Sequence, residues 1–283
     1  MNINWYPGHM VKAKRMITEN LKLVDLVVEI LDARLPYSSR NPDFEKLFNN
    51  KKKVIVLNKY DLADPSVTTQ WQKYYESSDI EVITVNSKTG SGNKDFINAI
   101  NKVMADKFER DRLKGMKQRP VKAMICGIPN SGKSTFINKL TGSAPARTGD
   151  KPGVTKDRQW IKIHKNIHML DTPGVLWPKF DDDKIALNLA ITGAINDEIL
   201  DLEQISRKLL SFLTENYSEN LKKRYDLNEL NSDPHKLLLD ICMHRNFIKS
   251  GGEPDTLKAA IIILDEFRAG KIGRISLEAP NEF

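Results

Sequence analysis

The chain has 283 residues, which is enough for two domains or for one large domain with an appendage. Charged residues make up 29% of it and no apolar run is long enough to span a bilayer, so a membrane-spanning function is excluded and we expect a cytoplasmic protein without a membrane partner. The formal net charge of +7 is compatible with an RNA or DNA partner, although scattered lysines are often no more than a solvated surface.

The cysteines and the N-terminal residues fit this expectation. Cys126 lies in an apolar strand pattern and Cys242 in an apolar helix pattern, so both are expected to be buried thiols in a reducing compartment. Neither has the spacing of a metal site. The first residues lack a basic start followed by an apolar stretch, so we expect no secretory signal. We also expect the protein to act as a monomer.

The first part of the chain alternates between strand and helix patterns. Short β-branched runs bounded by polar residues predict strands at 24–31, 54–57, 80–85 and 121–126, and a hairpin formed by 160–164 and 167–170. Helical spacing lies between them, near 11–22, 42–49, 66–77, 92–113 and 133–141. This alternation predicts an α/β fold with a mostly parallel, doubly wound sheet.

The pattern changes after residue 180, where strand signals almost vanish. Helices are predicted at 184–192, 202–216, 221–225, 234–246 and 255–267. Asp201, Asp233 and Asp255 are expected to cap three of them. The sequence therefore predicts an α/β domain at 1–178 and an all-α C-terminal domain at 179–283.

A phosphate-binding loop lies near the middle of the chain. The motif Gly127-x4-Gly132-Lys133-Ser134 follows the strand at 121–126 and opens a helix, which is the context it needs. Backbone N–H groups of such a loop turn toward phosphate oxygens, and the helix N-terminus favours negative charge. Lys133 is expected to reach the β- and γ-phosphates and Ser134 to place its hydroxyl on Mg²⁺. The remaining expected phosphate contacts are Asn130, Ser131, Gly132 and Thr135.

A second motif, Asp171-Thr172-Pro173-Gly174, ends the next apolar strand. Its carboxylate can hold Mg²⁺ through the water shell of the ion, and the Gly174 N–H can meet the γ-phosphate. Between the two motifs, Thr155 is expected to be the switch threonine that ligates Mg²⁺ only when a triphosphate is bound.

A third motif, Asn58-Lys59-Tyr60-Asp61, closes a strand and therefore lies at the carboxyl edge where open sheets bind ligands. Asp61 can accept hydrogen bonds from the ring N–H and the amine of guanine, a donor pair that adenine lacks. Lys59 is expected to lie along the base, and Asn58 to tie this motif to the phosphate loop. Asn86 and Ser87 end the next strand and are expected to supply a backbone N–H to the guanine oxygen.

The order of these motifs is unusual. In an ordinary guanine-nucleotide switch the phosphate loop precedes the base-reading motif, whereas here it follows it. The intervals within each half are intact and only their order is exchanged. The sequence therefore predicts a circularly permuted P-loop GTPase domain followed by the helical domain.

The order of motifs, together with Trp5-Tyr6-Pro7-Gly8-His9-Met10 and Asp32-Ala33-Arg34, resembles the YlqF-type family of permuted GTPases, the ribosome biogenesis GTPase A family. The resemblance implies a GTP hydrolase, stimulated by the ribosome, that binds the precursor of the large (50S) subunit and its rRNA at a late step of assembly. Two alternatives remain open: a nucleotide-gated RNA-binding module, and a GTPase that acts on tRNA or on a protein.

The catalytic residue and a second cation are further expectations. Many switch GTPases carry a glutamine just after the Asp-x-x-Gly motif to orient water, but Val175 stands there and cannot hydrogen-bond. We expect His9 to replace it, in keeping with the resemblance. Asn130 is expected to hold K⁺ beside the phosphates, as in GTPases with a similar loop.

The helical part follows directly after the switch motif, so nucleotide state can reach it through the chain. The resemblance favours RNA contact for its basic residues, Lys222, Lys223, Arg224, His244, Arg245, Lys249, Arg268, Lys271 and Arg274.

Overall fold

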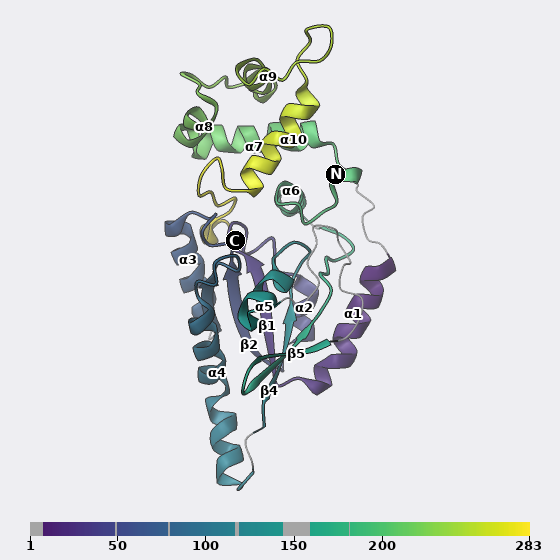
Figure 1. The fold of residues 1–283 in the computed structure, drawn as a ribbon, viewed down its shortest axis with the longest axis vertical. Helices are drawn as coiled ribbons and strands as arrows, with labels where there is room; N and C mark the ends of the chain where they lie inside the picture. The colour runs from purple at the N-terminus through teal and green to yellow at the C-terminus, as the bar shows by residue number, and fades with distance from the viewer. Residues whose placement is uncertain (1–7, 49, 79, 117–118, 144–158, 181) are drawn as a thin grey trace. The chain divides into compact units, whose positions relative to one another are not determined.

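The computed structural model describes residues 8–48, 50–78, 80–116, 119–143, 159–180 and 182–283. These residues form two compact units (Figure 1). The nucleotide unit contains the described residues up to Phe180 together with Ser276–Phe283, and the helical unit contains those in between, up to Ile275. Residues 276–283 were predicted to belong to the helical domain. They belong instead to the nucleotide unit, because Leu277 and Glu278 are buried against it.

The nucleotide unit is built on one six-stranded sheet with the order β3-β2-β1-β4-β6-β5. Neighbouring strands are parallel except β6 and β5, which form the predicted antiparallel hairpin. All residues of β1 are buried, as expected for a parallel strand covered on both faces. The mostly parallel sheet predicted from the sequence is confirmed. The strands are β1 Leu26–Asp32, β2 Lys52–Asn58, β3 Glu81–Val85, β4 Val121–Cys126, β5 Gln159–His164 and β6 Ile167–Asp171.

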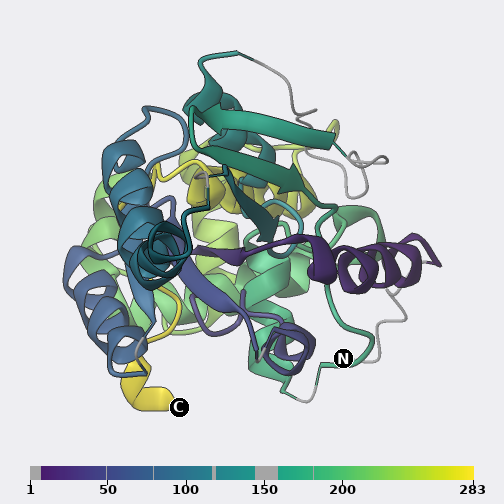
Figure 2. The ribbon, with the colours of Figure 1, turned by 90° about the horizontal axis from the view of Figure 1, so that it is seen from below.

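Helices cover both faces of this sheet. Alternate residues of β1 and β2 pack with Phe96 of α4 and Phe136 of α5 on one face. The other residues of these strands pack with Trp71 and Tyr75 of α3 on the opposite face. Figure 2 shows α1 and α2 on the same side as α3. The helices are α1 Gly8–Asn20, α2 Pro42–Leu47, α3 Pro65–Glu76, α4 Asn93–Leu113 and α5 Lys133–Thr141, with short 3-10 turns at Leu21–Leu23 and Pro280–Glu282.

The helical unit is held by caps and an apolar core. The predicted N-caps are confirmed, since the carboxylates of Asp201, Asp233 and Asp255 each accept a backbone N–H from the first turn of their helix. Leu209 and Ile263 are fully buried where α7 packs against α10. The helices are α6 Asp183–Ile191, α7 Leu202–Asn216, α8 Ser218–Tyr225, α9 Pro234–His244 and α10 Thr256–Arg268, with a 3-10 turn at Asp197–Ile199.

Two sequence expectations about burial can be checked directly. Cys126 and Cys242 are both completely buried, as predicted. Burial raises the pKa of the Cys126 thiol to about 12, so this thiol is not a nucleophile at neutral pH. Among the helices that the structure describes, none is both long and apolar enough to cross a bilayer.

Candidate nucleotide site

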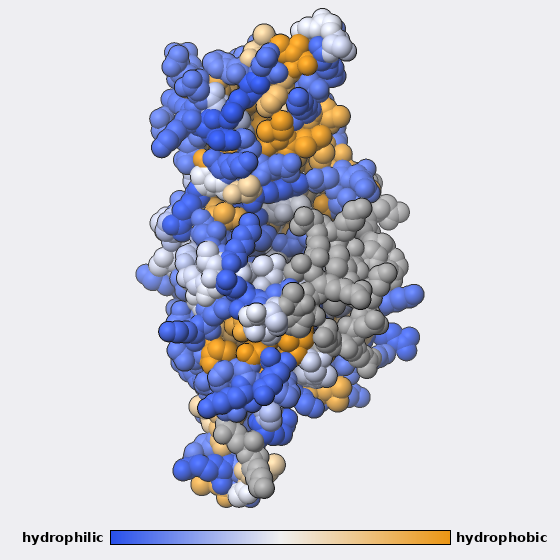
Figure 3. All heavy atoms as spheres, viewed as in Figure 1, coloured by the Kyte–Doolittle hydropathy of each residue, from blue (hydrophilic) through white to orange (hydrophobic). Residues whose placement is uncertain are grey.

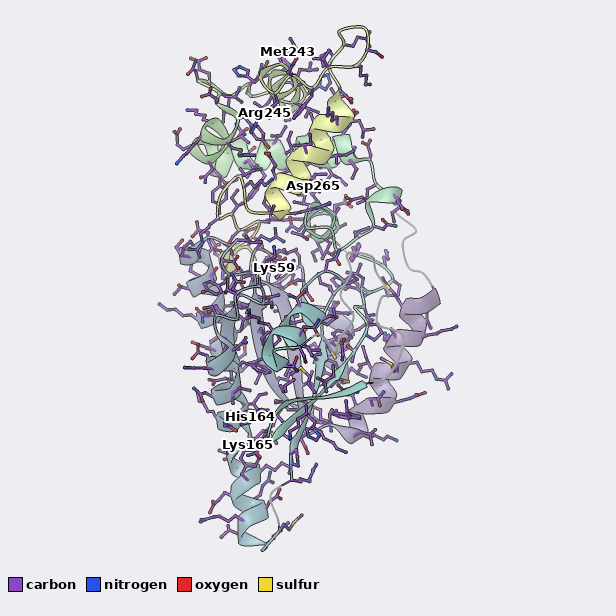
Figure 4. The ribbon with its side chains drawn as sticks, in the orientation of Figure 1. Lys59, His164, Lys165, Met243, Arg245 and Asp265 are labelled. Carbon is purple, nitrogen blue, oxygen red and sulfur yellow. The ribbon has the colours of Figure 1, made fainter. Side chains whose placement is uncertain are left out.

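The three predicted motifs meet at one edge of the sheet, where the parallel strands have their carboxyl ends. Asn58 ends β2, the phosphate loop follows β4, and Asp171 ends β6. Lys59 lies at this edge, whereas His164 and Lys165 of the hairpin mark the opposite end of the sheet (Figure 4). An open α/β sheet binds ligands at its carboxyl edge. The exchanged order of the motifs in the chain is therefore compatible with one common site.

Two glycines of the phosphate loop are required by close contacts. A Cβ atom at Gly127 would lie 2.5 Å from the carbonyl oxygen of Ile30. At Gly132, where φ is +93°, it would lie 2.3 Å from Nδ2 of Asn58. The hydroxyl of Ser131 donates to the Ile128 carbonyl at 2.9 Å and closes the loop on itself. The loop leads directly into α5, so its backbone presents the helix N-terminus to an anion.

The ammonium group of Lys133 lies inside this loop. It donates to the carbonyl oxygens of Ile128 at 2.6 Å and Gly127 at 3.2 Å. Burial lowers the pKa of Lys133 to about 8, and the nearby charge of Asp171 acts in the opposite direction. The group is therefore positioned for phosphate, and a phosphate would stabilise its charged form.

Ser134 and Asp171 supply two oxygen atoms beside the loop. The Ser134 hydroxyl lies 3.5 Å from Oδ2 of Asp171, which is buried. Mg²⁺ in nucleotide sites is commonly held by one or two protein oxygens together with phosphates and water, so this donor set fits the ion. The described residues contain no cluster of three or more His, Cys, Asp or Glu side chains that could hold a metal by itself. Thr155, the predicted switch threonine, lies outside the described residues. Thr135 lies in the first turn of α5 and is half-buried.

The segment after Asp171 packs closely on the phosphate loop. A Cβ atom at Gly174 would lie 2.7 Å from the backbone of Pro129, so only glycine fits. The Val175 N–H donates to the Gly127 carbonyl at 3.2 Å. The Val175 side chain is fully buried, so it belongs to the core and cannot orient a water molecule. His9 lies in α1, but its side chain is outside what the structure describes, and its predicted role stays a prediction.

Asn58 joins three loops through one buried amide. Its Nδ2 donates to the Ser131 carbonyl at 2.7 Å, which is the predicted link to the phosphate loop. Its Oδ1 accepts the Ser87 hydroxyl at 2.7 Å and the Ser87 N–H at 3.2 Å. The loop after β3 is thereby fixed to the base-reading motif.

Lys59 is held by two partners in a left-handed backbone conformation, with φ of +61°. Its ammonium donates to the Asn130 carbonyl at 2.7 Å and to Asp32 at 2.9 Å. Burial lowers the pKa of Lys59, and Asp32 opposes that effect. Burial alone would raise the pKa of Asp32, but Arg34 and Lys59 outweigh it and hold that pKa well below its usual range.

In the sequence, Asp32 and Arg34 were considered only as part of a motif that resembles the family. It was not predicted that they lie in the site. The Arg34 guanidinium pairs with Asp32 through two hydrogen bonds of 2.9 and 2.8 Å, and both side chains are almost completely buried. The signal that could have revealed them is their position directly at the end of a strand of the same sheet.

The remaining predicted base contacts lie in the turns beside Asn58. Asp61 is half-buried in the turn after β2, and the Tyr60 hydroxyl lies 3.0 Å from the hydroxyl of Ser91. The side chain of Asn86 accepts the N–H groups of Lys88 and Thr89 and so shapes its own turn. The side chains of Asn86 and Ser87 therefore position the loop, and the expected contact of its backbone with guanine stays a prediction.

Some of the basic residues predicted to contact RNA are ion-paired within the helical unit. Arg224 pairs with Glu266. Arg268 pairs with Asp197 at 2.7 Å and also donates to carbonyls at the end of α6, so it stabilises the fold.

The helical unit also has a pocket of about 370 Å³ that the sequence did not reveal. Its lining beside the start of α9 includes Arg207, Lys208 and His235. Figure 3 shows that apolar side chains also gather on this unit, where Met243 is 59% exposed.

Comparisons with known proteins agree with the geometry. A family model described as a 50S ribosome-binding GTPase matches residues 122–240. A ribosome biogenesis GTPase A from Bacillus pumilus is 46% identical over 280 residues, which are 99% of each chain. The relative of the same name from Thermotoga maritima is 32% identical over 99% of this chain and 95% of its own.

Solved structures extend the likeness to three dimensions. The GNP-bound YlqF from T. maritima is 29% identical, with a TM-score of 0.67 over 95% of this chain and 98% of its own. The GDP-bound form is 27% identical, with a TM-score of 0.68 over 94% of this chain and 100% of its own. The chain therefore belongs to the YlqF-type ribosome biogenesis GTPase A family and is a GTPase with a circularly permuted nucleotide-binding domain.

Proposed function

We propose that this GTPase binds the immature large (50S) ribosomal subunit and its rRNA, and that GTP binding and hydrolysis are coupled to a late step of subunit assembly. The observation that carries the proposal is the 46% identity to a ribosome biogenesis GTPase A over 99% of both chains, since it spans both units. The description of the matching family model as a 50S ribosome-binding GTPase supports the same partner. We propose further that the protein works in the cytoplasm as a monomer.

In this proposal the nucleotide lies along the carboxyl edge of the sheet. Asp61 accepts hydrogen bonds from guanine, Lys59 lies beside the base, and the loop at Asn86 and Ser87 presents a backbone N–H to the guanine oxygen. The tie between Asn58 and Ser131 supports a single site for base and phosphates. Phosphate contacts are assigned to Lys133, the loop backbone at Asn130–Gly132, Thr135 and the Gly174 N–H.

Magnesium is assigned to Ser134 and Asp171, and the 3.5 Å between their oxygen atoms supports this pair. When bound, the ion neutralises charge on the phosphates. Thr155 is proposed as a further ligand in the triphosphate state. Asn130 is proposed to hold K⁺ beside the phosphates, which turnover in K⁺ and in Na⁺ compares directly. Equal rates in the two salts would exclude a potassium site.

Orientation of the attacking water is assigned to His9. The burial of Val175 supports this assignment, because the position that carries glutamine in other switch GTPases faces the core here. Stimulation by the ribosome is then proposed to act on the orientation of His9 toward the γ-phosphate.

Contact with rRNA is assigned to the helical unit. Arg207 and Lys208, which line the pocket together with Asp233, support this, because phosphate groups bind arginine and lysine side chains. Binding of an RNA backbone through such residues weakens as salt concentration rises.

The experiment that tests the proposal compares GTP hydrolysis with and without purified large-subunit precursors. The proposal predicts that precursors raise kcat well above the rate of the free protein, and that mature small subunits do not. Equal stimulation by tRNA or by an unrelated RNA would favour a different partner. Hydrolysis that no particle stimulates would contradict the coupling.

A further inference from the structure

The last residues of the chain form a strap on the nucleotide unit. This C-terminal strap, Ser276–Phe283, begins with three residues that are at most 4% exposed: Ser276, Leu277 and Glu278. Burial of a carboxylate requires partners, because an isolated buried charge is strongly unfavourable. The partners of Glu278 therefore indicate what the strap holds in place.

Glu278 holds the loop that follows β1, residues 34–41. Its carboxylate accepts the backbone N–H groups of Tyr37 and Ser38, and it also accepts the Ser38 hydroxyl. Hydrogen bonds to an ionised acceptor are roughly twice as strong as neutral ones. One side chain from the end of the sequence thus fixes the middle of the 34–41 loop.

The first end of this loop leads to the base-reading motif. The Leu277 N–H donates to the Arg34 carbonyl at 2.8 Å. The guanidinium of Arg34 donates one hydrogen bond to each carboxylate oxygen of Asp32. Asp32 in turn holds the ammonium of Lys59 at 2.9 Å, and Lys59 also reaches the phosphate loop. The strap is therefore linked to Lys59 through an unbroken series of covalent and hydrogen-bonded contacts.

The other end of the loop leads to the switch motif. The side-chain amide of Asn41 donates to the Val175 carbonyl at 3.1 Å. The same side chain caps α2 by accepting the Asp43 N–H at 3.0 Å, so it is held from both sides. The 34–41 loop is thus linked at one end to the base-reading motif through Asp32, and at its other end it contacts the segment that follows the Asp171 motif.

We propose that the C-terminal strap is a positioning element for nucleotide binding, in which Glu278 holds the 34–41 loop and thereby sets Lys59 through Arg34 and Asp32. The inference rests on the proposed nucleotide site. Because coupling between two sites is reciprocal, bound nucleotide also strengthens docking of the strap. In the sequence, the helical unit then lies between two segments that belong to the nucleotide unit. The switch segment ends at Phe180, before the helical unit, and the strap begins at Ser276, after it.

A strap that only anchors the chain terminus is the competing explanation. Contacts of this kind exist. The Trp71 indole N–H donates to the Glu278 carbonyl at 3.2 Å, and the ring of Phe283 stacks on that of Tyr37 with 3.7 Å between the ring centroids. An anchor and a positioning element both contribute to stability, so a loss of stability does not distinguish them. Coupling to Lys59 distinguishes them, because residues in one hydrogen-bond network show non-additive effects.

The test is a double-mutant cycle read out as the Kd for a fluorescent GDP analogue in the presence of Mg²⁺. Glu278→Gln removes the charge and keeps the shape of the side chain, and it is measured alone and in a Lys59→Gln background. We expect about tenfold weaker binding from Glu278→Gln in the wild-type background and less than about twofold in the Lys59→Gln background. Trp71→Phe serves as the control: it removes the hydrogen bond to the backbone carbonyl of Glu278 but keeps the Glu278 carboxylate, so it should lower Tm while leaving Kd unchanged.

The same fold-change in both backgrounds would overturn the inference, as would an unchanged Kd for Glu278→Gln alone. Should Glu278→Gln fold poorly, Ser38→Ala removes one of the same hydrogen bonds and should show the same dependence on Lys59 with a smaller change. Failure of the wild-type protein to bind GDP at all would instead overturn the nucleotide site, and the role of the strap with it.

Discussion

The side-chain amide of Asn58 donates to the Ser131 carbonyl at 2.7 Å and joins two motifs whose order in the chain is exchanged. This contact makes the permutation compatible with a single site. The base-reading motif follows β2 and the phosphate loop follows β4, yet both sit at the carboxyl edge of one sheet. Asn58 also fixes Ser87, so three loops depend on one buried side chain.

Asn58→Ala should therefore lower both stability and nucleotide affinity. It leaves the Ser131 carbonyl and the Ser87 hydroxyl without their buried partner, which costs about 1–3 kcal/mol in the free energy of unfolding. Denaturant unfolding and GDP binding measure the two effects. Asn216→Ala, an exposed asparagine in α7, is the control and should change stability by less than about 0.5 kcal/mol. Unfolding curves that coincide for the two variants would contradict the role of Asn58.

Asp61→Asn should change base preference. In the proposed site the carboxylate accepts two hydrogen bonds from guanine, whereas the amide of asparagine would offer a donor to the second carbonyl group of xanthine. Affinity for GDP should fall by roughly a hundredfold or more, while affinity for XDP rises. Competition binding with GDP, XDP and ADP measures the change. A variant that still prefers GDP would show that Asp61 does not read the base.

Nucleotide affinity should depend on pH through Lys133. Burial lowers its pKa to about 8 in the free loop, and phosphate contact must raise it. Binding therefore takes up a proton above that pH, and affinity is lost as pH rises through about 8. Calorimetry at pH 8 in buffers of different ionisation enthalpy should give an uptake of roughly half a proton per site. No uptake would mean that Lys133 is already fully charged in the free protein.

His9→Ala should separate binding from hydrolysis. Val175 is buried and cannot position water, so kcat should fall by about a hundredfold or more while Kd for GTP stays within a factor of about two. Single-turnover hydrolysis and nucleotide binding measure the two quantities. His164→Ala, at the opposite end of the sheet, is the matched control and should leave kcat unchanged (Figure 4). An unchanged kcat in His9→Ala would remove His9 from the mechanism.

Local patterns predicted most of the fold. Buried β-branched runs predicted the strands, and Asp201, Asp233 and Asp255 capped helices as expected, because capping depends on residues a few positions apart. Motif spacing also predicted which loops share the sheet edge, since parallel strands bring their carboxyl ends together.

Apart from the link between Asn58 and the phosphate loop, contacts between residues distant in the sequence were not predictable in this way. The bond from Ser38 to Glu278 joins residues separated by 240 positions, and no periodicity records such a pairing. Arg268 was expected to contact RNA, but it pairs with Asp197, 71 positions away. The sequence showed Arg34 only as part of a short motif. Its role could not be predicted, because Arg34 pairs with Asp32, and Asp32 also holds Lys59, which comes from the neighbouring strand.

The central claim is that GTP governs binding to the large-subunit precursor. It is tested most directly by sucrose-gradient sedimentation of the protein with such precursors, with a non-hydrolysable GTP analogue in one sample and GDP in the other. We predict that the protein co-sediments with the precursor when the analogue is bound and remains near the top of the gradient with GDP. Sedimentation that does not depend on the nucleotide, or the absence of co-sedimentation in both samples, would contradict it.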